Sequence, residues 1–193
     1  MKKKLFYLFS ALMVVGIGIY SCGRSNSKNP KSVAESQNED KMSKSSDETR
    51  AQYLVDTYSS ALYELKAAEV AKTRAAHKNV KILADKIAKS NQKLNDQIKK
   101  LASSKNVSLP DDLTPNQHDK LQSMMEKKGG DFDKEFIDQM VSYYKDDVSK
   151  LEKVSNEEND PAFKTFASSS LPVVRGHLDT ATTLQDHLKS SKK

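Results

Sequence analysis

From residue 47 onward, apolar side chains recur three or four positions apart, which is the spacing of one face of an α-helix. No stretch shows the alternation that is typical of a β-strand. The sequence therefore predicts an all-α chain, an up-down four-helix bundle with a short extra helix in the central connection. The expected long helices cover about residues 47–76, 80–105, 131–156 and 161–189, and the short one covers 115–128.

Turn and cap residues mark the expected helix ends. Ser45 stands three positions before Glu48, which is the spacing of a capping box at the start of the first helix. Thr114 and Asp160 each precede a proline, and proline is well tolerated at the first position of a helix. A pair of glycines stops the short helix, and Asp131 behind them is the expected cap of the third long helix.

The first 21 residues have a different pattern. Three lysines are followed by about sixteen residues without charge and then by small residues, which is the order of a secretory signal. Ile19, Ser21 and Cys22 resemble a bacterial lipobox, with an aliphatic residue at minus three, a small one at minus one and then the cysteine. We expect cleavage before Cys22 and acylation there, which supplies the two or more chains that stable anchoring needs. The alternative is an ordinary signal peptide followed by an unmodified thiol.

The rest of the chain then divides into three parts. Residues 22–46 hold the acylated Cys22 and a polar segment with almost no large apolar side chain, so we expect a disordered tether. Residues 47–189 form the bundle, and 190–193 form a frayed tail. Gly23 is not the aspartate that retains lipoproteins in the inner membrane of enteric bacteria. The expected location is the outer membrane of a Gram-negative bacterium, facing the periplasm.

Charge and composition exclude several functions. Without residues 1–21, 29 basic and 26 acidic side chains remain, and no basic stripe suggests nucleic-acid binding. Cys22 is the single cysteine, so the exported domain holds no internal disulfide. No serine, histidine and aspartate spacing and no glycine-rich phosphate loop occurs, so enzymatic activity rests only on analogy of fold. The membrane, reached through the lipid anchor, is the partner that the sequence indicates; no protein partner or oligomeric state is indicated.

Three segments carry a resemblance to a known family. Residues 80–84, 130–141 (GDFDKEFIDQMV) and 171–178 (LPVVRGHL) resemble, in order and spacing, a bacterial family of predicted outer-membrane proteins of unknown function that is regarded as ferritin-like. The resemblance implies a ferritin-like fold and a location in the envelope. Relatives often have Asp-His where this chain has Ser90 and Asn91, and a histidine where it has Tyr144.

Each long helix places a polar residue in its apolar stripe. These residues are Glu69, Asn91, Tyr144 and His177, with Asp147 three positions after Tyr144. Four polar groups that converge in a bundle core form either a hydrogen-bond network or a metal site. We interpret them as a network, which is tolerated only when all its members are satisfied. In this interpretation His177 and Glu69 form a structural pair.

A metal site is the alternative. Ferritin-like metal pairs use a Glu-x-x-His motif on each of two helices, and no such motif occurs in this sequence, so we expect no di-metal cofactor. His177 and Glu69 alone are the metal-ligand candidates. The leading hypothesis is a lipid-anchored, non-catalytic helical bundle with an interaction, structural or stress-related role. The alternatives are a ferritin-like metal-binding or redox protein with a reduced site, and a domain that binds small ligands between its helices.

Overall fold

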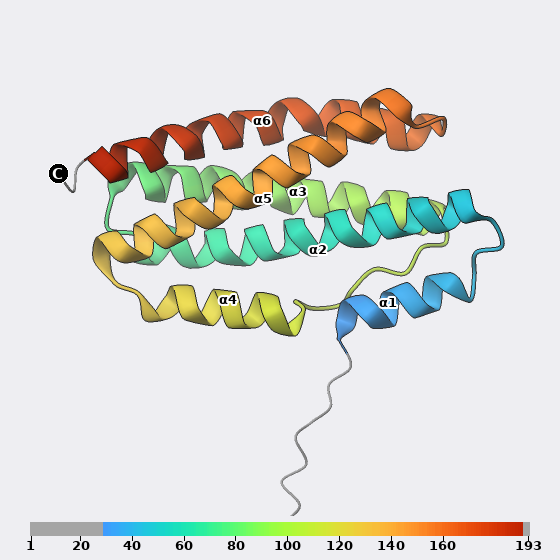
Figure 1. Ribbon diagram of the computed structural model, residues 1–193, viewed down its shortest axis with the longest axis horizontal. Coiled ribbons are helices and arrows are strands. Elements are labelled where there is room, and N and C mark those ends of the chain that lie inside the picture. The colour runs from blue at the N-terminus through green and yellow to red at the C-terminus, as the bar shows by residue number, and fades with distance from the viewer. Residues whose placement is uncertain (1–28, 191–193) are drawn as a thin grey trace, which may run out of the picture.

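The computed structural model describes residues 29–190, which form six α-helices and, within that range, no strand (Figure 1). The prediction of an all-α chain is therefore confirmed. No helix in this range is both long and apolar enough to cross a membrane. The expected signal peptide at 1–21, Cys22 and residues 191–193 lie outside the described residues. The helices are α1 (Pro30–Glu39), α2 (Ser45–Arg74), α3 (Lys78–Ser104), α4 (Pro115–Glu126), α5 (Gly129–Glu157) and α6 (Pro161–Ser190).

The four long helices pack as two antiparallel pairs (Figure 1). Helix α2 packs against α3, and α5 packs against α6, with a short turn inside each pair. The pairs meet where α3 contacts α6 and α2 contacts α5. The long connection between α3 and α5 carries α4 back along the bundle, so α3 and α5 run in the same direction, and the expected up-down order is wrong at this connection (Figure 1). Helices α1 and α4 lie one after the other beside α2.

Apolar side chains of the long helices fill the space between the two pairs. On α5, Phe132, Phe136 and Met140 follow one another at intervals of four residues, and none of them is exposed. Burial of an apolar side chain of this kind contributes about 1.5–3 kcal/mol to the free energy of unfolding. The predicted stripes of the other helices meet them in one cluster, with Leu54, Leu83, Ile87, Ile98, Ile137 and Phe163 fully buried.

Two of the expected helix caps are confirmed and two are wrong. Thr114 and Gln117 form a reciprocal capping box at the start of α4, and the Asp160 carboxylate accepts the backbone N–H of Ala162. Ser45, however, already lies inside α2, whose N-cap Lys44 has no side-chain cap bond. Helix α5 begins at Gly129, before the expected cap, and this glycine has a φ of +55°, which few other residues tolerate and which breaks the chain direction between α4 and α5.

The expected disordered tether contains a helix, which corrects that part of the prediction. Asn29 caps α1, and Ala34 is buried against α2. The Asn38 side chain donates to the carbonyl of Ser108 at 2.9 Å and accepts the N–H of Ser108 at 2.7 Å. The prediction considered only apolar burial, whereas α1 is held largely by polar contacts of this kind.

Candidate functional site

Four of the five predicted core polar residues are buried. Asn91 of α3, Tyr144 and Asp147 of α5 and His177 of α6 are each at most 9% exposed. Glu69 is exposed, so its assignment to the core is wrong. The neighbouring residue 68 is fully buried, and one further step along the helix turns the side chain by about 100°, which carries Glu69 to the solvent side.

The buried carboxylate of α2 is Glu64, which is only 1% exposed. It stands three residues after Ala61 and four before Ala68, both buried, so the same apolar spacing already marked this position. The Asn91 amide donates to Glu64 Oε2 at 2.7 Å. Glu64 therefore takes the place in the core that the sequence analysis assigned to Glu69.

Glu64 meets a second carboxyl group from the opposite helix pair. The side chains of Glu64 and Asp147 lie within hydrogen-bond reach of each other, so a proton on Glu64 can be donated to Asp147. Burial, and then the charge of Asp147, hold the pKa of Glu64 well above its ordinary value. Burial also raises the pKa of Asp147 to about 6, although the hydrogen bond from Glu64 opposes this rise. At neutral pH the pair therefore holds one proton on Glu64 and one negative charge on Asp147.

The two carboxyl oxygens that lack other partners fit this protonation state. Glu64 Oε1 and Asp147 Oδ1 are buried and receive no bond from a nitrogen or hydroxyl donor within the described range. A proton between two carboxyl groups satisfies both of them. The hollow beside Asp147, lined also by Thr57, Leu94 and Lys150, measures about 10 Å³, which is room for one water at most. This cluster is closed to any substrate.

The other two predicted residues form a separate contact. The rings of Tyr144 and His177 lie 5.6 Å apart, and His177 Nε2 is 2.6 Å from the hydroxyl of Ser90. Burial, and then the charge of Lys86, lower the pKa of His177, which keeps the ring neutral at pH 7. The expected pair of His177 with Glu69 is therefore wrong, because the partner of His177 is Ser90.

The core offers two carboxyl groups to a metal rather than the larger set that a metal pair requires. Between residues 29 and 190, no three His, Cys, Asp or Glu side chains are grouped so that they could hold an ion. Glu64 and Asp147 are adjacent, with the Asn91 amide beside them. The hydroxyl of Tyr144 is buried and has no hydrogen-bond partner among residues 29–190. These are the residues that a single ion would have to use.

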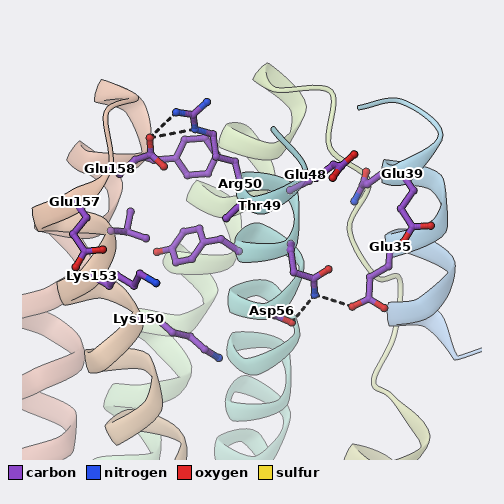
Figure 2. A pocket seen from close by; sticks show the side chains of 16 residues that line it. Glu35, Glu39, Glu48, Thr49, Arg50, Asp56, Lys150, Lys153, Glu157 and Glu158 are labelled. Carbon is purple, nitrogen blue, oxygen red and sulfur yellow. Dashed lines mark hydrogen bonds and ion pairs between the residues drawn. The ribbon is translucent and has the colours of Figure 1, made fainter. Parts of the chain in front are cut away.

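A groove on the outside of the bundle is the second candidate site. It measures about 650 Å³ and crosses from α1 over the first turns of α2 to the end of α5 (Figure 2). The half-buried Tyr53 and Val154 contribute apolar surface between its walls. Helix α4 packs against both α2 and α5 further along the bundle, whereas the main packing partner of α1 is α2, and the groove lies along this part of the seam between α2 and α5 (Figure 1).

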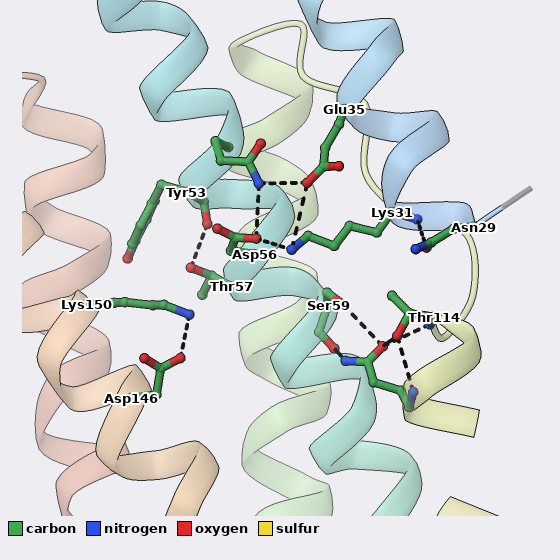
Figure 3. Close-up of polar contacts among 12 residues, drawn as sticks. Asn29, Lys31, Glu35, Tyr53, Asp56, Thr57, Ser59, Thr114, Asp146 and Lys150 are labelled. Atoms are coloured by element: carbon green, nitrogen blue, oxygen red, sulfur yellow. Dashed lines mark hydrogen bonds and ion pairs between the residues drawn. The ribbon is translucent and has the colours of Figure 1, made fainter. Parts of the chain in front are cut away.

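Ion pairs neutralise only part of the charge in the groove. Arg50 binds Glu158 at 2.7 Å, and Lys150 binds Asp146 at 2.6 Å (Figures 2 and 3). Lys31 reaches Asp56 at 2.5 Å from the first turn of α1 (Figure 3). Four charged side chains of the lining have no hydrogen bond or ion pair to another described residue: Glu39, Glu48, Glu157 and Lys153.

One comparison with known proteins decides the family. The family model described as "Domain of unknown function (DUF4142)" matches residues 32–184, which is most of the chain. The chain belongs to the DUF4142 family. No curated protein and no solved structure matches it significantly.

The DUF4142 match includes most of α1, in agreement with the packing of α1 against the bundle. The match begins at residue 32, inside α1, and ends at residue 184, inside α6. It therefore includes both the core carboxyl pair and the whole lining of the groove. Helix α1 belongs to the DUF4142 domain and is not part of a tether in front of it.

Proposed function

We propose that this chain is a lipid-anchored DUF4142 domain of the bacterial envelope, exported by its N-terminal segment and held at the outer membrane on the periplasmic side. The support is the lipobox-like order of Ile19, Ser21 and Cys22 behind an uncharged stretch. Because α1 begins at Pro30, only residues 23–29 separate the anchor from the domain. Seven residues reach at most about 25 Å, so the domain works close to the membrane surface.

The role of the domain in this location is non-catalytic, and the domain binds through its surface. The observation that carries this proposal is the closed core, where Glu64 and Asp147 satisfy each other and the adjoining hollow of about 10 Å³ has no room for a substrate. The groove of about 650 Å³ is, in contrast, within the range of 300–1,000 Å³ that is usual for ligand sites. Binding therefore takes place outside the bundle.

The arrangement of the long helices supports a ferritin-like bundle. Two antiparallel pairs, α2 with α3 and α5 with α6, are joined by one long connection that returns along the bundle. Ferritin-like folds use one such long connection, whereas simple up-and-down bundles use short loops throughout. This topology is the ground for assigning the fold.

A metal-binding role is the second candidate, and one observation favours it. Glu64 lies in the core where Glu69 was expected, and it is bonded to Asp147, so two carboxyl groups are adjacent. A divalent ion that displaced their shared proton would bind at this pair and at the amide of Asn91. The proton competes with such an ion, and the missing Glu-x-x-His motif leaves it few ligands.

Replacement of Cys22 by serine in the full chain tests the anchor. The thioether to the lipid cannot form on a hydroxyl in this processing reaction, so Cys22→Ser should move the protein out of the detergent phase or leave the precursor uncleaved. Ser21→Ala is the matched control, because a small residue stays at the minus-one position. Equal partitioning of wild type and Cys22→Ser, with no lipid mass on either, would contradict the anchor.

A further inference from the structure

The groove carries an excess of negative charge within a nearly neutral part of the chain. Residues 29–190 hold 25 basic and 26 acidic side chains, yet the lining alone holds six carboxylates against three cationic side chains. Glu39, Glu48 and Glu157 are the carboxylates without a partner among the described residues, and Lys153 is the corresponding cation. The groove is therefore complementary to a cationic ligand.

The free carboxylates stand on different walls. Glu39 comes from α1, Glu48 from the start of α2 and Glu157 from the end of α5, and Figure 2 shows them around the rim. Apolar surface of the half-buried Tyr53 and Val154 lies between these walls. A ligand that satisfies both features carries separated positive charges that are linked by short apolar segments.

We propose that the groove binds a linear polyamine, with its ammonium groups at the carboxylates of the rim and its methylene segments on the apolar surface between them. Two other classes of ligand, a bare metal ion and a protein segment, fit the groove less well. A bare metal ion needs its ligands within one coordination sphere, and no such group of acidic residues occurs from residue 29 to residue 190. A stable protein interface buries about 800 Å² on each partner, whereas a groove of about 650 Å³ has the size that is usual for a small-molecule site.

The proposal rests on the proposed surface-binding role but not on the lipid anchor, so the two can fail separately. The partition of Cys22→Ser between phases tests the anchor alone. Calorimetric titration of the full chain, purified in a non-ionic detergent, with the triamine spermidine tests the ligand alone. We expect binding at one site per chain, and we expect it to weaken as ionic strength rises because these carboxylates are exposed to solvent.

Substitutions of opposite sign make the test specific. Glu48→Gln combined with Glu157→Gln should weaken spermidine binding by about three- to thirtyfold. Lys153→Gln removes the opposing cation and should strengthen binding by about two- to fivefold. Glu126→Gln, which makes the same charge change at the exposed end of α4, is the control and should leave the affinity unchanged.

Three results would overturn the proposal. The first is equal binding by wild type and the double groove variant. The second is full competition by Mg²⁺ at the same concentration, since cations held only as screening counter-ions are not selected by their shape. The third is binding of trilysine more tightly than spermidine, which would indicate a basic protein segment as the ligand. Circular dichroism of each variant, with an unchanged helical signal, ensures that a loss of binding is not a loss of fold.

Discussion

Glu64 and Asp147 reach the same point of the core from α2 and α5, and their carboxyl groups share a hydrogen bond. This contact ties the first antiparallel helix pair to the second. It places a negative charge inside an apolar core at neutral pH, which is unfavourable unless hydrogen bonds compensate for it. Stability should therefore depend on the protonation of these two groups.

The first prediction concerns the effect of pH on the free energy of unfolding. The pKa of Asp147 is about 6 in the folded chain, whereas the ordinary value is near 4, so between these pH values the folded state holds more protons than the unfolded state. Stability contributed by this group therefore falls as pH rises from about 4 to about 6. The loss amounts to about 2–3 kcal/mol for Asp147.

Urea unfolding at pH 4.5, 6 and 7.5 measures this effect against the double variant Glu64→Gln with Asp147→Asn. Other carboxylates, such as Glu158 beside Arg50, have lowered pKa values, so the stability that they contribute rises with pH. These carboxylates are the same in wild type and variant, and their contribution cancels in the comparison. The difference between wild type and variant should grow in favour of the variant as pH rises. An identical pH profile for the two would show that the carboxyl pair does not titrate in this range.

The second prediction separates the hydrogen bonds of Glu64 from its charge. Gln keeps an oxygen for the amide of Asn91 and an N–H for Asp147, so Glu64→Gln should keep the stability within about 1 kcal/mol at pH 7.5. Glu64→Ala leaves both neighbours without a partner and opens a cavity, and it should lower the free energy of unfolding by about 2–4 kcal/mol. Glu69→Ala on the exposed face is the control and should change it by less than about 0.5 kcal/mol. Equal losses for Gln and Ala at position 64 would contradict the arrangement.

The long helices could be predicted from the sequence because each has an apolar stripe long enough to fix its period. The sequence also allowed a correct choice between Glu64 and Glu69. Glu64 stands three residues after Ala61 and four before Ala68, which are both buried, whereas Glu69 directly follows Ala68. The pairing of Glu64 with Asp147 could not be predicted, since it depends on which helices pack against each other and on how far they are shifted along their axes. Helix α1 was missed because its main tertiary anchor is Asn38, a polar residue whose partner lies 70 positions away.

The third prediction concerns α1. Asn38→Ala removes two hydrogen bonds to the backbone of Ser108 and leaves those groups with water alone, so it should lower the free energy of unfolding by about 1–2 kcal/mol. Gln37→Ala, at the exposed neighbouring position, should have almost no effect. Thermal unfolding followed by circular dichroism compares the two. Because α1 forms one wall of the groove, limited proteolysis near residue 38 should also become faster in Asn38→Ala than in wild type.

The fourth prediction distinguishes a structural core from a metal site. Micromolar zinc, iron(II) or manganese should leave the melting temperature of the wild type unchanged at pH 7.5, since the two carboxyl groups already share a proton and no third acidic or histidine side chain is grouped with them in the described part of the chain. A ligand that binds only the folded state raises the melting temperature by mass action, so thermal scans with and without metal are a direct measurement. The double variant Glu64→Gln with Asp147→Asn is the matched control, because it keeps the shape of both side chains and removes both potential anionic ligands.

A rise of several degrees in the wild type that disappears in this variant would overturn the structural interpretation and favour the metal-binding role. A rise of equal size in both proteins would instead locate metal binding at the surface, where Glu39 and Glu48 of the groove are the first carboxylates to replace by glutamine.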